Sequence, residues 1–247
     1  MFDLTVEGSI ARLILTRPEA RNAIRLTGWH ELASAAETAV AHGARVLILS
    51  GSPGGAFCAG SDVSDFDGFR GDAEARTRFR TAIRDGLDRL SALTIPTIAQ
   101  VEGACYGAGV AVAMACDIRV AAASARFAIT PAKLGISYPQ EDVHRLVSLV
   151  GPGQAARLLF SAGSIDGAEA GRIGLAEIVA EVSDEAALDL AREMAINDEQ
   201  SLLTLKRAVR LAAAGVSHDN RQDRAFDDLL GSNALFERLE AYRGRRK

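Results

Sequence analysis

The sequence predicts an α/β fold in which helices cover a largely parallel sheet and a helical region follows the sheet. Two observations carry this prediction. Short apolar runs at residues 46–49 (VLIL) and 97–101 (TIAQV) are typical of buried strands, and the charged segment 72–93 between them has the character of a helix. A strand, a long helical crossover and a second strand imply parallel neighbours in one sheet. Beyond Asp184 the pattern is helical only.

The remaining elements follow in order along the chain. Residues 4–7 and 10–15 alternate in the manner of strands around Gly8, which predicts a hairpin. Residues 26–41 have helical spacing, with Thr27 as the expected cap. Further strands are expected at residues 118–121 and 178–182, each after a helix-like segment. Helices are expected at residues 185–194, 199–214, 219–230 and 234–242.

Composition bounds the class of protein. The chain has 247 residues, of which 48% are hydrophobic, so it can bury one large core, and we expect one main domain with an appendage. The formal net charge of −4 argues against a general nucleic-acid or membrane-surface role. The longest uncharged run, residues 103–116, is too short to span a bilayer, and no signal-peptide pattern follows Met1. We therefore expect a soluble, cytoplasmic protein without membrane insertion.

The three cysteines, Cys58, Cys105 and Cys116, lie in apolar or glycine-rich surroundings and do not have the spacing of metal ligands. We expect them to be reduced and buried as small hydrophobic side chains. No metal site is predicted.

Two glycine-rich turns, residues 54–62 and 103–109, each follow a predicted strand and precede a segment that can become helical. Backbone N–H groups at such turns can remain unpaired, and two of them from adjacent strands can form an oxyanion hole, assisted by helix dipoles. Neither turn matches a phosphate loop, a dinucleotide fingerprint or a nucleophile elbow. The alternative is that these glycines only permit tight packing between strands and helices.

The motifs around these turns resemble a known family. They are PEARNAI at residues 18–24, AFCAGSD at 56–62, VEGACYGAG through ACDIRVA at 101–121, FAITPAKLGIS at 127–137 and GAEAGRIGLAEIV at 167–179. In order and spacing they resemble the enoyl-CoA hydratase/isomerase (crotonase) superfamily, from about Leu4 to the last helix.

The resemblance implies a crotonase-like spiral of ββα and βαβ units over residues 1–190, which binds acyl-CoA, and a helical trimerisation region over residues 191–247. The expected assembly is a homotrimer or a dimer of trimers. The expected substrate is an acyl-CoA whose thioester oxygen lies between the backbone N–H groups of Ser61 and Ala108. Coenzyme A is then part of the substrate, and no metal or redox cofactor is implied.

The resemblance also implies a set of residues that bind the substrate or its coenzyme A portion: Arg21, Ala23, Ala59, Gly60, Asp62, Gly107 and Tyr138. For Arg21 the alternative is a solvated side chain, and for Asp62 it is a carboxylate that accepts N–H groups of its own loop. Tyr242, Arg245 and Arg246 fall where the last helix of the family often reaches a neighbouring subunit's coenzyme A.

The sequence departs from the hydratases of that family at two positions. They carry one glutamate on the helix after the second turn and another further along, whereas this chain has Ala111 and Pro131 there. Neither residue can carry a proton. The remaining candidates for an acid or base are Glu141 and Asp142, with the weaker His144 nearby, although the acidic position of some relatives would fall nearer Pro139.

A structural interpretation of Glu141 and Asp142 stands beside the catalytic one. Acidic side chains in a first helical turn interact favourably with the helix dipole, and Glu141 has the spacing to pair with Arg145.

These observations favour double-bond isomerisation through a thioester enolate over hydration. The alternatives are an acyl-CoA-binding paralogue without turnover, a hydratase with a non-standard acid or base, and a hydrolase or decarboxylase on the same scaffold.

Overall fold

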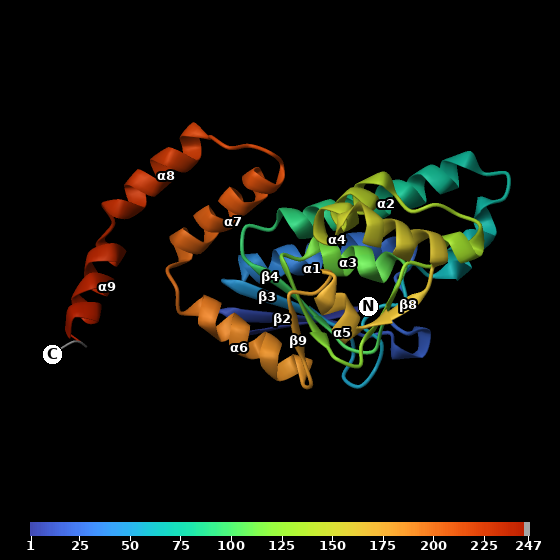
Figure 1. Cartoon of the computed structure of the whole chain (residues 1–247), viewed down its shortest axis with the longest axis horizontal. Coiled ribbons are helices and arrows are strands. Elements are labelled where there is room, and N and C mark those ends of the chain that lie inside the picture. Colours follow the sequence, from blue (N-terminus) through green and yellow to red (C-terminus); the bar gives the residue numbers. More distant parts are fainter. Residues whose placement is uncertain (245–247) are drawn as a thin grey trace.

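The computed structural model describes residues 1–244 and shows a main sheet with helices on both faces, from which the last three helices extend to one side (Figure 1). In this part of the chain the main sheet has six strands in the order β1-β2-β3-β4-β6-β9. β1 is antiparallel to β2, and the other pairs are parallel. These strands are β1 (Phe2–Glu7), β2 (Ile10–Leu15), β3 (Val46–Ser50), β4 (Thr97–Val101), β6 (Ile118–Ala122) and β9 (Ile178–Ala180).

A second sheet of three short strands lies beside the first. Its order is β5-β7-β8, with β5 parallel and β8 antiparallel to β7. Its members are β5 (Ala104–Tyr106), β7 (Arg126–Ala128) and β8 (Ser164–Asp166). The α/β spiral expected from the sequence is therefore present, and the small sheet is an addition to it.

The α-helices of the described chain fall into two groups. The first group forms the body of the molecule with the sheets: α1 (Leu26–Ala41), α2 (Ala73–Ala92), α3 (Ala108–Ala115), α4 (Gln140–Ser161), α5 (Gly167–Arg172) and α6 (Ser183–Ala195). Of these, α1, α3, α5 and α6 pack on the sheets, whereas α2 packs mainly on α1 and α3, and α4 mainly on α3. The second group is called the C-terminal arm below: α7 (Glu199–Ala213), α8 (Asn220–Leu230) and α9 (Asn233–Gly244). Short 3-10 turns occur at Pro18–Ala20, Val63–Phe69 and Pro131–Leu134.

The buried strands divide their side chains between two cores, as a period of two requires. On one face, Leu47 and Leu49 of β3 belong to the large core formed with α1, α2 and α3. On the other face, Val46 and Ile48 pack with Ala187 of α6. The apolar runs predicted as strands are therefore fully buried because helices cover both of their faces.

Two local predictions from the sequence are wrong. Thr27 does not cap α1: the helix begins after Arg25, and the carboxylate of Asp65 accepts the N–H of Leu26 at 2.8 Å. The cap therefore comes from a distant loop. Arg145 does not pair with Glu141 but lies 3.5 Å from Asp142 and 3.3 Å from Asp88 of α2.

The first helix of the C-terminal arm, α7, still contacts the body: its buried Lys206 donates to the carbonyl of Ile95 and to the carboxylate of Asp117, each at 2.7 Å. The helices α8 and α9 extend to one side of the molecule (Figure 1). Residue 190, the expected domain boundary, falls inside α6, whose Ala187 and Ala191 pack on the main sheet. Large apolar side chains of the arm are exposed, among them Phe226 (61%) and Phe236 (55%). Arg245 and Arg246 lie outside the described residues.

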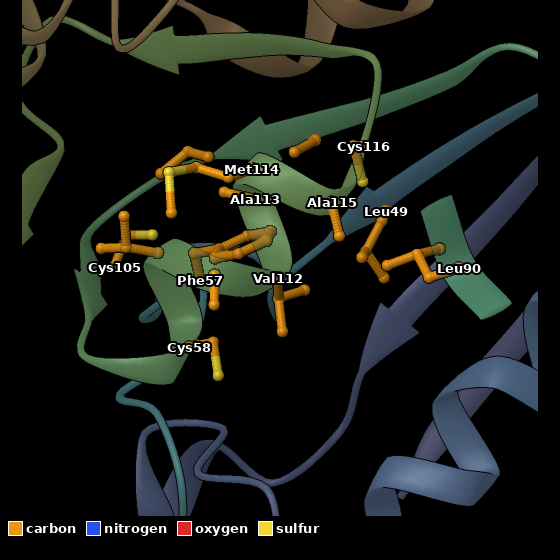
Figure 2. Close-up of a cluster of buried hydrophobic side chains, with 14 of the residues drawn as sticks. Leu49, Phe57, Cys58, Leu90, Cys105, Val112, Ala113, Met114, Ala115 and Cys116 are labelled. Atoms are coloured by element: carbon orange, nitrogen blue, oxygen red, sulfur yellow. The ribbon is translucent and has the colours of Figure 1, made fainter. Parts of the chain in front are cut away.

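The three cysteines are buried free thiols, as expected. Figure 2 shows Cys58 and Cys105 with Phe57 beside α3, and Cys116 where that helix ends. Burial raises the pKa of the Cys58 and Cys116 thiols to about 12, so they remain protonated. Within residues 1–244, no helix is long and apolar enough to cross a membrane, and no group of three or more His, Cys, Asp or Glu side chains is placed to hold a metal ion.

Candidate functional site

The two glycine-rich turns are joined by backbone hydrogen bonds. The N–H of Cys58 donates to the carbonyl of Ala104 at 3.1 Å, and the N–H of Tyr106 donates to the carbonyl of Cys58 at 2.9 Å. A side chain on Gly109 would place its Cβ 2.2 Å from the Cys58 carbonyl oxygen. The glycines therefore do permit the close packing that the sequence suggested, and the packing brings the two turns together.

Gly60 shows how near the turns approach each other. Its φ is +103°, and an added Cβ would lie 2.9 Å from the carbonyl oxygen of Tyr106 and 3.0 Å from the backbone nitrogen of Ala108. Only glycine combines this conformation with this contact at low cost. Ser61, the next residue, therefore lies directly beside the start of α3.

The N–H groups of Ser61 and Ala108 are both left without an acceptor from residues 1–244. Ile24 forms a parallel β-bridge with Ser61: the N–H of Ile24 donates to the carbonyl of Gly60 at 2.8 Å, and the carbonyl of Ile24 accepts the N–H of Asp62 at 2.9 Å. Because backbone N–H groups alternate in direction along an extended strand, the N–H of Ser61 points away from Ile24. Ala108 is the first residue of α3, where an N–H has no partner within the helix.

Both residues line a cavity of about 440 Å³. Its wall is largely apolar, with side chains from the Val63–Phe69 turn, from α2 and from the segment that follows Pro131–Leu134. The rings of Phe66 and Phe79 meet edge to face with their centroids 5.4 Å apart. The large aliphatic and phenylalanine side chains that line it are Val63, Phe66, Phe79, Ile83, Leu134 and Ile136. An acyl chain fits such a wall because it gains contacts without leaving a polar group unpaired.

Asp142 is the only carboxylate among the described residues that line this cavity. It lies in the first turn of α4 and is 1% exposed. Arg84 of α2 donates to it at 3.2 Å, and Arg145 lies 3.5 Å away. Burial raises the pKa of Asp142, while the positive charges of Arg84 and Arg145 act in the opposite direction. A buried carboxylate with a perturbed pKa in a cavity is a candidate functional group.

Glu141, the other candidate base, lies elsewhere. Its side chain is exposed, and Glu141 is not among the residues that line the 440 Å³ cavity. His144 is also exposed and is not among them. Adjacent positions on a helix point about 100° apart, and only Asp142 of this pair is directed to the 440 Å³ cavity.

Ala111 and Pro131, which stand where the hydratases of the family carry glutamates, place no polar side chain at the site. Ala111 is fully buried in α3 as part of the large core. Pro131 lines the cavity from the short turn it begins. Tyr138 also lines the cavity, and its hydroxyl donates to the carbonyl of Gly107 at 3.1 Å.

Most of the residues expected at the coenzyme A portion lie in two segments that are hydrogen-bonded to each other, 21–24 and 59–62. The N–H of Ala59 donates to the carbonyl of Arg21 at 2.9 Å, which places the segment 21–24 against the first glycine-rich turn. Arg21 is exposed and Ala23 is buried. Asp62 accepts from the N–H and the hydroxyl of Ser64, as expected for a residue that orders its own loop. The Ser64 bonds, together with Arg17, lower the pKa of Asp62 to about 2.

Sequence reasoning missed four residues that contribute to this region. Arg17 donates to the Ala23 carbonyl at 2.7 Å and to the Asp62 carboxylate at 3.0 Å, so it links the segment 21–24 to the turn 59–62. Its position directly before the PEARNAI motif was the available signal. Phe79 and Ile83 of α2 line the cavity. The signal for them was an apolar pair at i, i+4 spacing within an otherwise charged helix. Nothing in the sequence indicated that Arg84 reaches α4.

Comparison with known proteins agrees with this architecture. The sequence model of the family described as enoyl-CoA hydratase/isomerase matches residues 5–244. An enoyl-CoA isomerase/hydratase of Zymoseptoria tritici is 30% identical over 97% of this chain and 83% of its own length. A short-chain-enoyl-CoA hydratase of Clostridium acetobutylicum is 34% identical over 83% of this chain and 79% of its own length.

The fold is also found among solved structures. A crystal structure of an enoyl-CoA hydratase/isomerase family protein from Hyphomonas neptunium superposes with a TM-score of 0.93 at 31% identity, over 99% of this chain and 95% of the other. The resemblance inferred from the motifs is therefore confirmed over nearly the whole chain, as is the crotonase-like fold.

Proposed function

The chain belongs to the enoyl-CoA hydratase/isomerase family, and from that premise we propose that it moves the double bond of an enoyl-CoA thioester by a single-base proton shuttle. The observation that carries the proposal is the placement of Asp142. Among the described residues of the cavity it is the one carboxylate, and both unpaired turn N–H groups line the same cavity.

In the proposed first step, the Asp142 carboxylate removes a proton from C2 of a 3-enoyl-CoA. The C2–H bond breaks, its electron pair is delocalised through the thioester, and the negative charge collects on the thioester oxygen. The N–H groups of Ser61 and Ala108 donate to that oxygen. Two fixed donors at a developing oxyanion lower the barrier by several kcal/mol, at about 3 kcal/mol for each donor.

In the second step, the carboxylic acid of Asp142 returns the proton to C4. A C4–H bond forms, the double bond moves to C2–C3, and the thioester carbonyl is restored. Atoms and charge balance without water or a redox cofactor. A buried base with a raised pKa suits both steps, since it takes the proton more readily than an ordinary carboxylate and does not lose it to bulk solvent.

Ala111 and Pro131 support isomerisation over hydration. Addition of water needs one group that activates the water and one that protonates the α-carbon, and neither of these side chains can do either. Asp142 alone can serve a shuttle, because that reaction has no net addition.

We place the coenzyme A portion along the patch formed by Arg21, Ala23 and the turn 59–62. Arg21 is exposed there and supplies a positive charge for a phosphate group. The C-terminal arm is the proposed oligomerisation region, since it presents Phe226 and Phe236 to solvent in the single chain. A homotrimer or a dimer of trimers would cover these side chains.

Product identity tests the proposed reaction. The protein is incubated separately with a 2-enoyl-CoA and a 3-enoyl-CoA, and the products are separated by chromatography and identified by mass. Interconversion of the two isomers, without a gain of 18 mass units, is expected. Formation of hydroxyacyl-CoA as the main product would overturn the isomerase assignment, and tight binding without turnover would favour a paralogue that only binds acyl-CoA.

A further inference from the structure

We propose that Tyr138 is a positioning residue for the Ala108 donor: its hydroxyl fixes and polarises the peptide group between Gly107 and Ala108. This role rests on the proposed function, because it presumes that the Ala108 N–H donates to a thioester oxygen. It assigns Tyr138 an action through the backbone rather than a contact with the coenzyme A portion.

The inference starts from the geometry of one peptide group. The hydroxyl of Tyr138 donates to the Gly107 carbonyl oxygen at 3.1 Å. That carbonyl carbon is bonded to the nitrogen of Ala108, so both ends of the same planar peptide are used, one by Tyr138 and one by the cavity. A donor placed on the oxygen fixes the plane and thereby the direction of the N–H.

The Gly107 backbone needs such a constraint. Its φ of 52° and ψ of −120° lie in a region that glycine enters and other residues avoid, so no side chain of its own restricts the turn. Its N–H donates to the Ala128 carbonyl at 2.8 Å, and its carbonyl oxygen also accepts the N–H of Val110 at 3.0 Å. Among the described residues, Tyr138 is the hydrogen-bond donor to the Gly107 carbonyl oxygen that comes from outside the turn and α3.

Two hydrogen bonds to one carbonyl also make the attached N–H a stronger donor. Each bond draws electron density toward the oxygen, which increases the positive charge on the hydrogen of Ala108, and such cooperativity strengthens a neighbouring bond by about 10–30%. The effect is greatest away from water, and Tyr138 is only 8% exposed.

The tyrosine is held in the donating form. Burial raises the pKa of Tyr138 well above its usual range, and the nearby charge of Asp142 acts in the same direction. The hydroxyl therefore keeps its proton at neutral pH, and its hydrogen remains available to Gly107.

The test compares Tyr138→Phe with the wild type by vibrational difference spectroscopy of a bound, unreactive saturated acyl-CoA. A thioester carbonyl that accepts strong hydrogen bonds absorbs at lower frequency, so the shift on binding reports the strength of the donors directly. We expect a red shift in the wild type and a smaller one in Tyr138→Phe. We also expect kcat to fall about 2- to 5-fold with KM nearly unchanged, because only the transition state carries the full charge on oxygen.

Two further proteins make the result specific. Tyr106→Phe removes a hydroxyl from β5, outside the residues that line the cavity, and should keep the wild-type shift and rate. Replacement of Tyr138 by 3-fluorotyrosine keeps the ring and supplies a more acidic hydroxyl. It should increase the red shift, which a purely structural role of the ring would not do.

The outcomes separate the two proposals. An unchanged red shift in both the Tyr138→Phe and the fluorotyrosine proteins would overturn the role of Tyr138 alone. Absence of any shift in the wild type would overturn the proposed oxyanion hole and this role with it. A loss of activity of about a thousandfold in Tyr138→Phe with the full red shift would make Tyr138 a catalytic group and would also contradict the positioning role.

Discussion

The guanidinium of Arg84 lies 3.2 Å from the carboxylate of Asp142, so α2 and α4 meet at the cavity through a charged pair. Burial and the arginine act on the carboxyl group in opposite directions, and burial is the larger effect. Asp142 is therefore expected to bind a proton more readily than a surface aspartate.

Arg84→Gln should raise the pKa of Asp142 further, because it removes the positive charge that favours the ionised form. The proposed base must be ionised to act, so the acidic limb of the kcat/KM profile should move to higher pH. Arg89→Gln is the matched control, since Arg89 lies on the same helix but pairs with Glu37. Identical acidic limbs in the wild type and Arg84→Gln would contradict this role of Asp142.

Gly109→Ala should destabilise the protein by about 2–4 kcal/mol, because its Cβ would meet the Cys58 carbonyl oxygen at 2.2 Å and push the two turns apart. The measurement is chemical denaturation. Gly153→Ala on α4 is the control: an added Cβ meets nothing within 4 Å there, and alanine favours the helix by about 0.5–1 kcal/mol. Equal effects of the two substitutions would refute the close approach of the turns.

Asp62→Asn should lower stability by about 1–2 kcal/mol near neutral pH, through the loss of charge-assisted bonds to Ser64 and Arg17. The pKa of Asp62 is about 2 in the folded protein against an ordinary 3.8. A lowered pKa gives stability that is present above the ordinary value and is lost as pH falls through the folded one. The difference between variant and wild type should therefore shrink between about pH 4 and pH 2. Thermal unfolding across this range checks the trend, and a constant difference would be inconsistent with it.

Replacing both Phe226 and Phe236 by serine should reduce the size of the assembly, since these side chains are 61% and 55% exposed in the single chain. Light scattering coupled to size-exclusion chromatography measures the mass. Phe160→Ser is the control, because Phe160 is exposed on α4 rather than on the arm. A monomeric wild type, or an unchanged mass in the double variant, would show that the arm does not hold the assembly together.

Strong local patterns allowed most of the main sheet to be predicted. The run at β3 is apolar except for its last residue, Ser50, and the run at β4 is apolar except for Thr97 and Gln100. Gly8 indicates the turn of the hairpin between β1 and β2. The small sheet could not be predicted, because strands of three residues such as β5 show no period. The extent of α4 could not be predicted, because Gly151 and Pro152 interrupt its helical pattern. The backbone departs from helical geometry at Gly151, whose φ is 74°.

The candidate site was predictable only where it depends on backbone. Ser61 and Ala108 were implied by their positions in the glycine-rich motifs that resemble the family, and both line the cavity in the structure. Glu141 and Asp142 could not be separated by sequence, because the choice between two neighbouring helical positions is made by how α4 packs on α2. The partner of Asp142 likewise comes from a different element, and one sequence carries no record of that contact.

The central claim is that Asp142 moves the proton, and the rates of Asp142→Asn and Glu141→Gln with a 3-enoyl-CoA test it most directly. Both substitutions remove one carboxylate from the first turn of α4, so they match in kind and position. We predict that Asp142→Asn loses at least about 10²-fold in kcat while still binding the substrate, and that Glu141→Gln stays close to the wild type. Full activity in Asp142→Asn, or a loss confined to Glu141→Gln, would contradict the claim.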